Sequence, residues 1–333
     1  MTPPSLNESS SILIVGAGTW GCSTALHLVR RGYKNVTVLD PYPVPSSIAA
    51  GNDVNKIMEH KELKGPNTDA RSIAFATCTR SALGGWTNDP IFKPYFHGTG
   101  LILSVYEAGD VIGARTADDV VHRADHTILA AGAGSDRLLD FKKQLRPTAW
   151  TLSHIQMTAE ESQLYRNLPV LFNVAKGFFM EPDEDEHHLK ICDEHPGYCK
   201  FIQDPNNAGE MKSSPFAKEQ IPLEAEARAR EFLRDTMPHL AERPFVFARI
   251  CWDADTPDRA FLIDRHPDHP SLIVAVGGSG NGAMQMPTIG GFIVDALEGK
   301  LQKELKDVVR WRPELAVNRD WKSTQNRFGD QIN

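Results

Sequence analysis

The sequence has little of what marks secreted, membrane-spanning or nucleic-acid-binding proteins. Its 333 residues include five cysteines, an odd number without the spacing of a disulfide framework, which favours a reducing compartment. Asp and Glu outnumber Lys and Arg by 43 to 36, and the net charge of −7 disfavours nucleic acid and anionic membranes as partners. No apolar run reaches membrane-spanning length, and the polar start MTPPSLNESS does not resemble a secretory signal.

Several functional signatures are also missing. The C-terminal residues Asp-Gln-Ile-Asn contain no Ser-Lys-Leu peroxisomal address, so a cytoplasmic location is expected. No Gly-x-Ser-x-Gly elbow is present, which disfavours an acyl-transfer enzyme. Cys192, His195 and Cys199 offer three ligands at irregular spacing, and we expect no metal there. The 41% hydrophobic and 24% charged composition is that of an ordinary globular protein long enough for two domains.

A glycine-rich sequence near the N-terminus, GAGTWG at residues 16–21, is the strongest motif. It follows SILIV (11–15), an apolar run of strand length, and precedes a helical pattern over residues 22–33. NVTVLD (35–40) then predicts a second strand that ends on an acid. Strand, Gly-x-Gly-x-x-Gly, helix, strand and acid together form a dinucleotide-binding unit.

The glycines and the acid have separate roles in such a unit. Gly16 permits the tight turn, Gly18 lets the backbone approach a pyrophosphate, and Gly21 allows the helix and strand to pack closely. The helix N-terminus offers N–H groups and the positive end of its dipole to phosphates. Asp40 lies where its carboxylate accepts hydrogen bonds from ribose hydroxyls. The sequence therefore predicts a bound dinucleotide.

The rest of the chain alternates between two kinds of pattern. Residues 101–132 predict a β-meander that leads into a buried strand, and residues 146–249 predict an antiparallel sheet with one helix. Residues 272–300 return to strand, glycine-rich turn and helix. The expected fold is α/β (α+β), with a discontinuous dinucleotide-binding domain (11–60, 107–145 and 250–300), an interleaved antiparallel-sheet substrate domain (61–106 and 146–249), and a C-terminal segment (301–333) that returns to the active site.

Residues 249–267, RICWDADTPDRAFLIDRHP, contain an unusual cysteine. By composition alone Cys251 is a buried structural residue, since the neighbouring acids disfavour a thiolate. However, Cys, an aromatic residue and Thr-Pro-Asp-x-x-Phe-x-Ile-Asp resemble the segment of sarcosine-oxidase-type flavoenzymes whose cysteine is bonded to the flavin 8α-methyl carbon. More closely, the chain resembles the fungal fructosyl amino acid oxidases (amadoriases), D-amino-acid-oxidase-like FAD oxidoreductases, through GAGTWG, LDPYPVP, AGNDVNKI, LRPTAWTL, KICDEHPGY, FARICW and FLIDRHP.

This resemblance implies both a fold and a reaction. The fold has a glutathione-reductase-like FAD-binding domain and a substrate domain. The reaction is oxidation of a fructosyl amino acid at its C–N bond, with hydride transfer to flavin N5 and hydrolysis of the imine to glucosone and an amino acid. O₂ then reoxidises the flavin and gives H₂O₂. A monomer is expected, with the glycated amino acid and O₂ as its small-molecule partners.

The resemblance also assigns roles to individual residues. Lys190 matches the lysine that lies over the flavin and assists oxygen reduction, and Lys56 matches a lysine near the other edge of the flavin. Glu194 and Arg327 match a pair that binds the substrate carboxylate, which a guanidinium fork suits. In an extended strand Lys190, Cys192 and Glu194 point to one face. The expected cofactor-binding residues are Gly16, Gly18, Thr19, Trp20, Gly21, Asp40, Gly51, Asn52, Lys56, Cys251, Gly280, Gly282 and Met284.

Two departures from the family pattern leave alternatives open. A long family stretch between HGTGLILS and the meander is missing, which exposes apolar faces and sheet edges unless the fold closes over the gap. After GSGNG the family usually has Phe-Lys, where this chain has Ala283-Met284 and lacks an ammonium beside the flavin. The sequence thus permits an oxidase of glycated amino acids, an oxidase of another secondary amine such as sarcosine or an imino acid, or a catalytically impaired flavoprotein remnant. An NAD dehydrogenase fits the first unit but leaves Cys251 unexplained.

Overall fold

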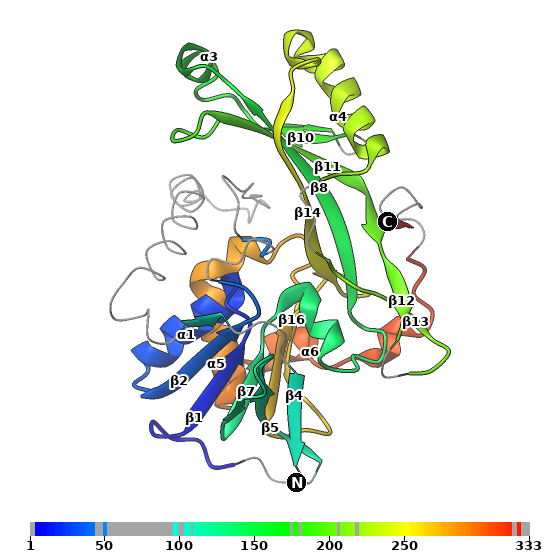
Figure 1. Cartoon of the computed structure of the whole chain (residues 1–333). Coiled ribbons are helices and arrows are strands. Elements are labelled where there is room, and N and C mark those ends of the chain that lie inside the picture. The colour runs from blue at the N-terminus through cyan, green and yellow to red at the C-terminus, as the bar shows by residue number, and fades with distance from the viewer. Residues whose placement is uncertain are drawn as a thin grey trace. The chain divides into compact units, whose positions relative to one another are not determined.

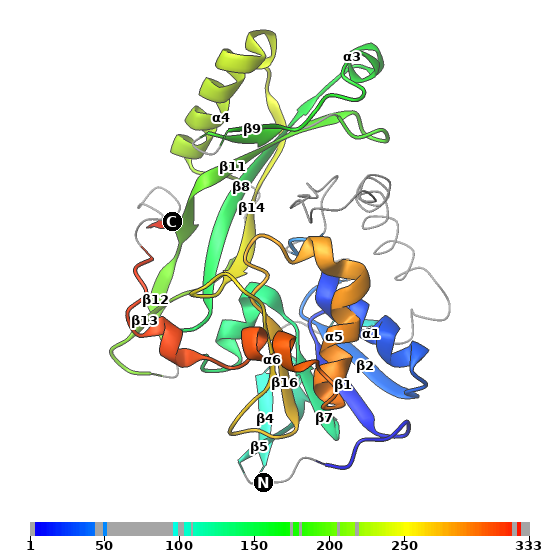
Figure 2. The ribbon, with the colours of Figure 1, turned by 180° about the vertical axis from the view of Figure 1, so that it is seen from behind.

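The chain folds into two compact units. The computed structural model describes residues 4–43, 49–51, 96–98, 103–107, 109–173, 176–179, 182–204, 207–216, 220–321 and 325–327. Unit 1 comprises Met1–Asn52, Met58–Arg146 and Asp253–Arg319, and unit 2 comprises Asp53–Ile57, Pro147–Trp252 and Asp320–Asn333. Figures 1 and 2 show the chain coloured from its N-terminus to its C-terminus from two opposite sides. Among the helices of the described ranges, none has the length and apolar character needed to cross a membrane.

Unit 1 is built on a six-stranded sheet with the order β15-β16-β7-β1-β2-β3. All neighbouring pairs are parallel except β15 and β16. The strand order reverses at β1, because the chain continues to β2 on one side and returns to β7 on the other. In open α/β sheets, ligands bind at the carboxyl ends of the strands at such a point. The strands are β1 (Ser11–Val15), β2 (Asn35–Asp40), β3 (Phe96–Gly98), β7 (His126–Leu129), β15 (Leu262–Arg265) and β16 (Leu272–Val276).

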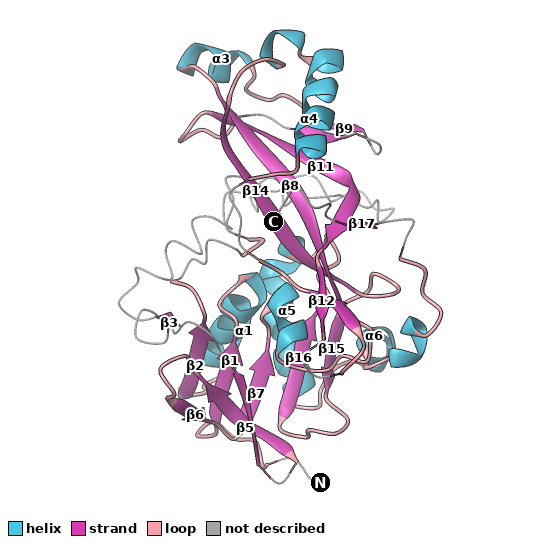
Figure 3. Cartoon of the chain, turned by 45° about the vertical axis from the view of Figure 1, so that its right-hand side comes forward, coloured by secondary structure: helices cyan, strands magenta, loops and turns pink. Residues whose placement is uncertain are grey.

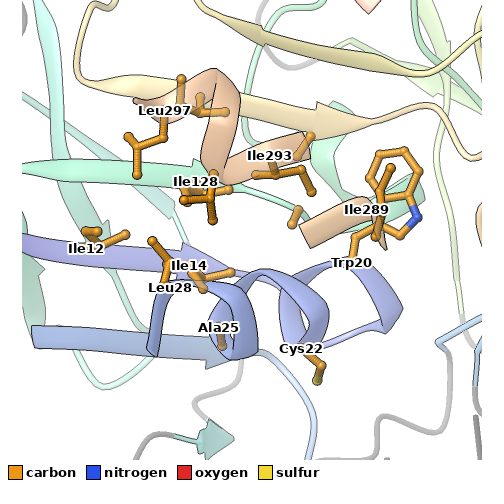
Figure 4. Close-up of a cluster of buried hydrophobic side chains, with 14 of the residues drawn as sticks. Ile12, Ile14, Trp20, Cys22, Ala25, Leu28, Ile128, Ile289, Ile293 and Leu297 are labelled. Atoms are coloured by element: carbon orange, nitrogen blue, oxygen red, sulfur yellow. The ribbon is translucent and has the colours of Figure 1, made fainter. Parts of the chain in front are cut away.

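Side chains of this sheet alternate between two apolar clusters. Ile12 and Ile14 point into the cluster under helices α1 (Thr19–Arg30) and α5 (Met286–Leu297), and Figure 4 shows these helices packed on one face. Leu13 and Val15 point into the opposite cluster, which Val111 and Ala114 of a small meander cover. The meander consists of β4 (Leu103–Glu107), β5 (Asp110–Arg115) and β6 (Val121–Arg123).

The meander packs on the sheet of unit 1 and is also tied to it by a hydrogen bond. β4 and β5 form a hairpin in which Glu107 lies opposite Asp110. The Ser271 hydroxyl, directly before β16, donates to the Asp110 carboxylate at 2.7 Å. This bond ties the hairpin to the start of β16. Val111 and Ala114 are buried, whereas Tyr106, Val120 and Val121, in and beside the meander, are exposed. The described part of the meander is thus attached to the sheet of unit 1.

The helices α1 and α5 cross at a glycine. A Cβ on Gly290 would lie 2.3 Å from the backbone carbon of Ser23, so a larger residue would force the helices apart. The buried Ser23 hydroxyl donates to the Met286 carbonyl at 2.5 Å and accepts from the Gly290 N–H at 3.0 Å. The first glycine turn (residues 16–18) precedes α1, and the second (Gly277–Gly282) precedes α5. The crossing therefore fixes the start of α1 against the start of α5.

Unit 2 contains a second six-stranded sheet with the order β14-β8-β11-β10-β9 and with β17 beside β11 (Figure 3). Helix α4 (Leu223–Thr236) covers one face, where Phe232 and Leu233 pack on Leu189 and Ile191 of β11. Among the described residues, this unit also contains α3 (Ala159–Leu164), η3 (Pro238–Leu240) and the hairpin of β12 (Phe201–Gln203) and β13 (Met211–Ser213). The strands are β8 (Arg146–Gln156), β9 (Leu171–Asn173), β10 (Gly177–Phe179), β11 (His188–Cys199), β14 (Phe245–Asp255) and β17 (Gln325–Arg327).

Two segments differ from the expected domain division. β3, within the predicted substrate-domain range 61–106, pairs with β2 in unit 1. The expected C-terminal segment 301–333 is divided, because α6 (Lys303–Val309) and η5 (Pro313–Ala316) belong to unit 1 and β17 to unit 2.

Arg312 explains why the segment before β17 stays with unit 1. Its side chain is 2% exposed, and its guanidinium donates from Nε and Nη2 to the Asp258 carboxylate at 2.9 and 2.8 Å. Its backbone N–H donates to Gln144 Oε1 at 2.8 Å. A bidentate pair with this much burial fixes the segment strongly to the loop after β14.

Two alanine substitutions in α5 test the helix crossing. We expect Gly290→Ala to lower the free energy of unfolding by about 1–3 kcal/mol, because the new methyl group meets the Ser23 backbone. Gly291→Ala should raise it by up to about 1 kcal/mol, since its nearest neighbour is the His27 ring at 3.4 Å and alanine favours the helix. Urea unfolding followed by circular dichroism measures both changes. Equal effects of the two substitutions would contradict the close crossing.

Candidate active site

The first glycine turn leaves an opening at the start of α1. Gly16 has a φ of +109°, and a Cβ there would lie 2.5 Å from the Ala130 carbonyl oxygen. A Cβ on Gly21 would lie 1.8 Å from the Gly16 carbonyl oxygen. At Gly18, in contrast, no described atom lies within 4 Å of a Cβ, and no side chain caps the helix. Packing therefore requires Gly16 and Gly21, whereas Gly18 leaves the approach that a pyrophosphate needs.

Asp40 at the end of β2 holds this turn in place. Its Oδ2 accepts from the Ala17 N–H at 2.8 Å, and its Oδ1 accepts from the Tyr42 N–H at 3.0 Å. Burial raises the pKa of the Asp40 carboxyl, and the two backbone N–H groups partly oppose that rise. Both carboxylate oxygens therefore hold the backbone of the turn. The sequence pointed to the ribose and missed this second role in shaping the turn.

The strand beside β1 ends in a second opening. β7 is followed by η2 (Gly132–Arg137), and at Gly132, with φ of +52°, no described atom lies within 4 Å of a Cβ. Ala130 packs against Gly16 and donates its N–H to the Val15 carbonyl at 2.8 Å. Two openings thus lie at the carboxyl ends of neighbouring parallel strands, where the strand order reverses.

Trp20 links the first glycine turn to the second. The indole Nε1 donates to the Gly282 carbonyl at 3.0 Å, and the ring packs edge-on against Phe261 with a centroid distance of 5.0 Å. Trp20 is largely buried, so its ring serves the core as well as the turns. Thr19, before it, is the first residue of α1.

The second glycine turn is held by the end of β14. Ser279 is fully buried and has a φ of +48°, in the left-handed region that non-glycine residues rarely adopt. Its N–H donates to the Ala254 carbonyl at 3.2 Å, and the Gly280 N–H donates to the Asp253 carboxylate. The Asn281 N–H donates to the Gly278 carbonyl at 2.8 Å. These three N–H groups therefore have acceptors within the protein.

Lys190 and Cys192 lie on the sheet face of unit 2 opposite α4. Leu189 and Ile191 pack under α4, whereas Cys192 packs with Leu152 of β8 and Cys251 of β14. Lys190 is two residues before Cys192 in the regularly paired part of β11, so it belongs to the same face. Its side chain is 2% exposed. One face of one sheet thus carries the predicted catalytic lysine and the predicted flavin-linking cysteine.

His154 shares this face and was missed in the sequence. It lies directly opposite Lys190 in the β8–β11 register and is buried. Its ring lies 4.9 Å from the Phe247 ring and 5.3 Å from the His188 ring, measured between centroids. A single histidine in a strand does not by itself indicate a functional site. Its position becomes visible only when the long-range register of two strands is known.

The predicted carboxylate-binding pair lies on adjoining strands. β17 runs parallel to β11, and Arg327 lies opposite Cys199. Glu194 lies in β11 where the register with β8 shifts, between Asp193 and Tyr198. The side chains of Glu194, Arg327 and Met284 lie outside the described residues, as do Asn52 and Lys56 altogether, whereas Gly51 is described and buried.

A buried ion pair fixes both ends of the irregular stretch in β11. Arg228 of α4 donates from Nη2 to Asp193 Oδ2 and to the Tyr198 hydroxyl, at 2.5 Å each, and from Nε to Asp193 at 3.2 Å. Burial raises the pKa of the Tyr198 hydroxyl, so it remains a neutral donor and acceptor. The backbone of Glu194 is thus anchored on both sides.

Comparison with known proteins establishes the family. The sequence profile of the FAD dependent oxidoreductases matches residues 11–86 and 98–296. The chain therefore belongs to the FAD dependent oxidoreductase family, and FAD is its cofactor. This confirms the predicted α/β fold with an FAD-binding domain.

Individual relatives narrow the comparison further. Fructosyl amine:oxygen oxidoreductase (Amadoriase I) from Aspergillus fumigatus is 60% identical, with a TM-score of 0.83, covering 99% of this chain and 96% of that structure. Amadoriase II from the same organism is 42% identical, with a TM-score of 0.82, covering 98% of this chain and 97% of that structure. L-saccharopine oxidase of Schizosaccharomyces pombe is 24% identical over 414 residues, covering 91% of this chain and 93% of that protein. That alignment is longer than the 333-residue chain, so the relative has residues without a counterpart here.

The described residues of unit 1 fit FAD. The opening at Gly18 is one that a Cβ would fill, and it lies at an uncapped helix N-terminus. Asp40, at the end of the adjoining strand β2, holds the turn through the Ala17 N–H. We infer that the FAD diphosphate binds at Gly18 and a ribose at Asp40.

A methyl group placed in the Gly18 opening tests this assignment. We expect Gly18→Ala to fold normally and to weaken FAD binding at least about tenfold, because the methyl group occupies space that the protein leaves open. Gly21→Ala is the matched control, since its methyl group meets the Gly16 carbonyl and should lower stability instead. Melting temperature and flavin retained on gel filtration separate the two effects. A Gly18→Ala protein with its full flavin content would contradict the assignment.

Proposed function

We propose that the chain is an FAD-dependent oxidase of glycated (fructosyl) amino acids. It oxidises the C–N bond of the substrate to an imine, reduces O₂ to H₂O₂, and releases glucosone and the amino acid. The observation that carries this proposal is the 60% identity over nearly the whole chain to a fructosyl amine:oxygen oxidoreductase. Bound FAD supplies the hydride acceptor for this reaction. The protein supplies binding, orientation and charge.

Lys190 acts on the oxygen half of the reaction. An ammonium held in a buried position stabilises negative charge that develops on O₂ as it is reduced. Burial removes competing water, which strengthens that interaction. Its place on the same sheet face as Cys251 supports a role next to the flavin.

Cys251 would hold the flavin through a thioether to its 8α carbon. The thiol is half-buried between Leu152 and Cys192, and β14 holds its backbone. Formation of the bond would release the thiol proton, one methyl proton and two electrons, which O₂ would accept as H₂O₂. The new C–S bond replaces an S–H and a C–H bond.

Arg327 and Glu194 bind the substrate carboxylate. Parallel pairing of β17 with β11 brings their two strands together. A guanidinium recognises a carboxylate through two parallel hydrogen bonds, and a neighbouring acid orients the guanidinium. This pair recognises the amino acid part of the substrate. Other residues recognise the sugar part.

A peroxide assay tests the function directly. We expect H₂O₂ from fructosyl-valine or fructosyl-lysine in the presence of O₂, and none from unglycated valine or lysine. Sarcosine and saccharopine test the alternative that the substrate is another secondary amine. Saccharopine is included because the chain is similar to L-saccharopine oxidase. Peroxide from these compounds alone would replace the proposed substrate class. A flavin-loaded protein that oxidises none of them would be an impaired remnant.

Two cysteine substitutions test the flavin link. After acid precipitation we expect the wild-type pellet to remain yellow and the Cys251→Ala flavin to stay in solution. Cys192→Ala is the matched control, because this thiol packs against the same residues and should leave the link intact. Flavin that stays in solution with the wild-type protein would remove Cys251 from this role.

Lys190→Met separates the two half-reactions. Loss of the buried ammonium should slow reoxidation by O₂ about 100-fold or more, since its charge is needed only as oxygen is reduced. Flavin reduction by substrate should change little. Stopped-flow absorbance measures each half-reaction. A variant in which only the reduction slows would refute the assignment.

A further inference from the structure

Asp253 connects the strand that carries Cys251 to the second glycine turn. It stands two residues after Cys251 in β14. Its Oδ2 accepts from the Gly280 N–H, and its Oδ1 accepts from the Ala254 N–H at 2.7 Å. Both carboxylate oxygens are thus bound to backbone donors, one on its own strand and one on the turn.

The turn that Asp253 holds is one that needs external support. Gly277, Ser279 and Gly280 have φ angles of +83°, +48° and +82°. A serine in the left-handed region is strained and persists only where surrounding contacts fix it. Thr256 donates its N–H to the Ser279 hydroxyl at 3.2 Å, and Arg259 donates to the Ser279 carbonyl at 2.7 Å. These contacts hold the middle of the turn.

Asp253 and Trp20 hold the far half of the same turn at two points. Asp253 binds the N–H of Gly280, and Trp20 binds the carbonyl of Gly282. The turn is tight against both side chains, because a Cβ on Gly278 would lie 3.1 Å from Asp253 Oδ1 and one on Gly282 would lie 3.1 Å from Trp20 Nε1. Since Trp20 belongs to the first turn of α1, these two bonds set the distance from the Gly18 opening to the end of β14.

A carboxylate at this position is costly. Burial raises the pKa of Asp253 to about 6, and the charge of Asp255 adds to the rise, while the N–H groups of Ala254 and Gly280 and the charge of Arg259 oppose it. A neutral acceptor would avoid that cost. Acids kept at such a cost are common where a side chain serves a functional site.

We propose that Asp253 is a positioning residue of the oxidase, which fixes the Gly277–Gly282 turn to the end of β14 so that the turn meets the flavin in one arrangement. The proposal rests on the proposed function for its setting. It predicts that loss of the acceptor at Gly280 releases the turn, and that attachment of the flavin then becomes incomplete.

The test compares two substitutions of Asp253 in the purified holoenzyme. In Asp253→Ala the fraction of flavin that precipitates with the protein in acid should fall at least fivefold, and the visible flavin spectrum should shift. Asp253→Asn keeps an oxygen acceptor for Gly280, and it should retain at least half of the wild-type fraction. Should Asp253→Ala fail to fold, Asp253→Ser takes its place, since its hydroxyl is too short to reach Gly280.

Asp258→Asn is the matched destabilised control. Asp258 lies in the same segment but binds the buried Arg312 guanidinium. Its substitution should lower the melting temperature and leave the precipitated fraction and the spectrum unchanged. Wild-type flavin attachment in Asp253→Ala, or equal loss in Asp253→Ala and Asp253→Asn, would overturn the proposal. An enzyme that attaches flavin but does not oxidise fructosyl amino acids would overturn the proposed function and leave this result standing.

Discussion

The crossing of α1 and α5 at Ser23 and Gly290 is the constraint on which unit 1 depends. Each helix begins just after a glycine turn, so fixing the helices against each other also fixes the turns. The Trp20–Gly282 hydrogen bond closes the same arrangement at the helix N-termini. Because the Gly290 position has no room for a Cβ, this geometry leaves little freedom for adjustment. A rigid frame of this kind can leave an opening such as that at Gly18 without collapse of the surrounding chain.

The same device supports both turns. Asp40 ends a strand and binds the Ala17 N–H of the first turn, and Asp253 near the end of β14 binds the Gly280 N–H of the second. In each case burial raises the pKa of the carboxyl group. An acid that shapes the backbone around a cofactor acts on chemistry without donating or accepting a proton in the reaction. In unit 2, Asp193 stands next to Glu194 in β11, and an ion pair with Arg228 holds it.

Local sequence predicted the parts of the fold that local interactions determine. β1 and β2 have the predicted bounds because apolar strands, glycines and an acid follow one another along the chain. α1 begins at Thr19 rather than at residue 22, since Gly18 is its N-cap. β17 and the positions of His154 and Asp193 depend on pairing between distant strands. Gln325–Arg327 has no apolar pattern, so only its contact with β11 makes it a strand.

The claim that most of the rest depends on is that unit 1 holds FAD. It is tested most directly by the visible absorption spectrum of the purified full-length chain, together with the ratio of flavin to protein after denaturation. We expect a yellow protein with flavin present in amounts equal to the chain. A folded, colourless protein that takes up no flavin when FAD is added would contradict the assignment of the Gly18 opening and of every role that depends on it.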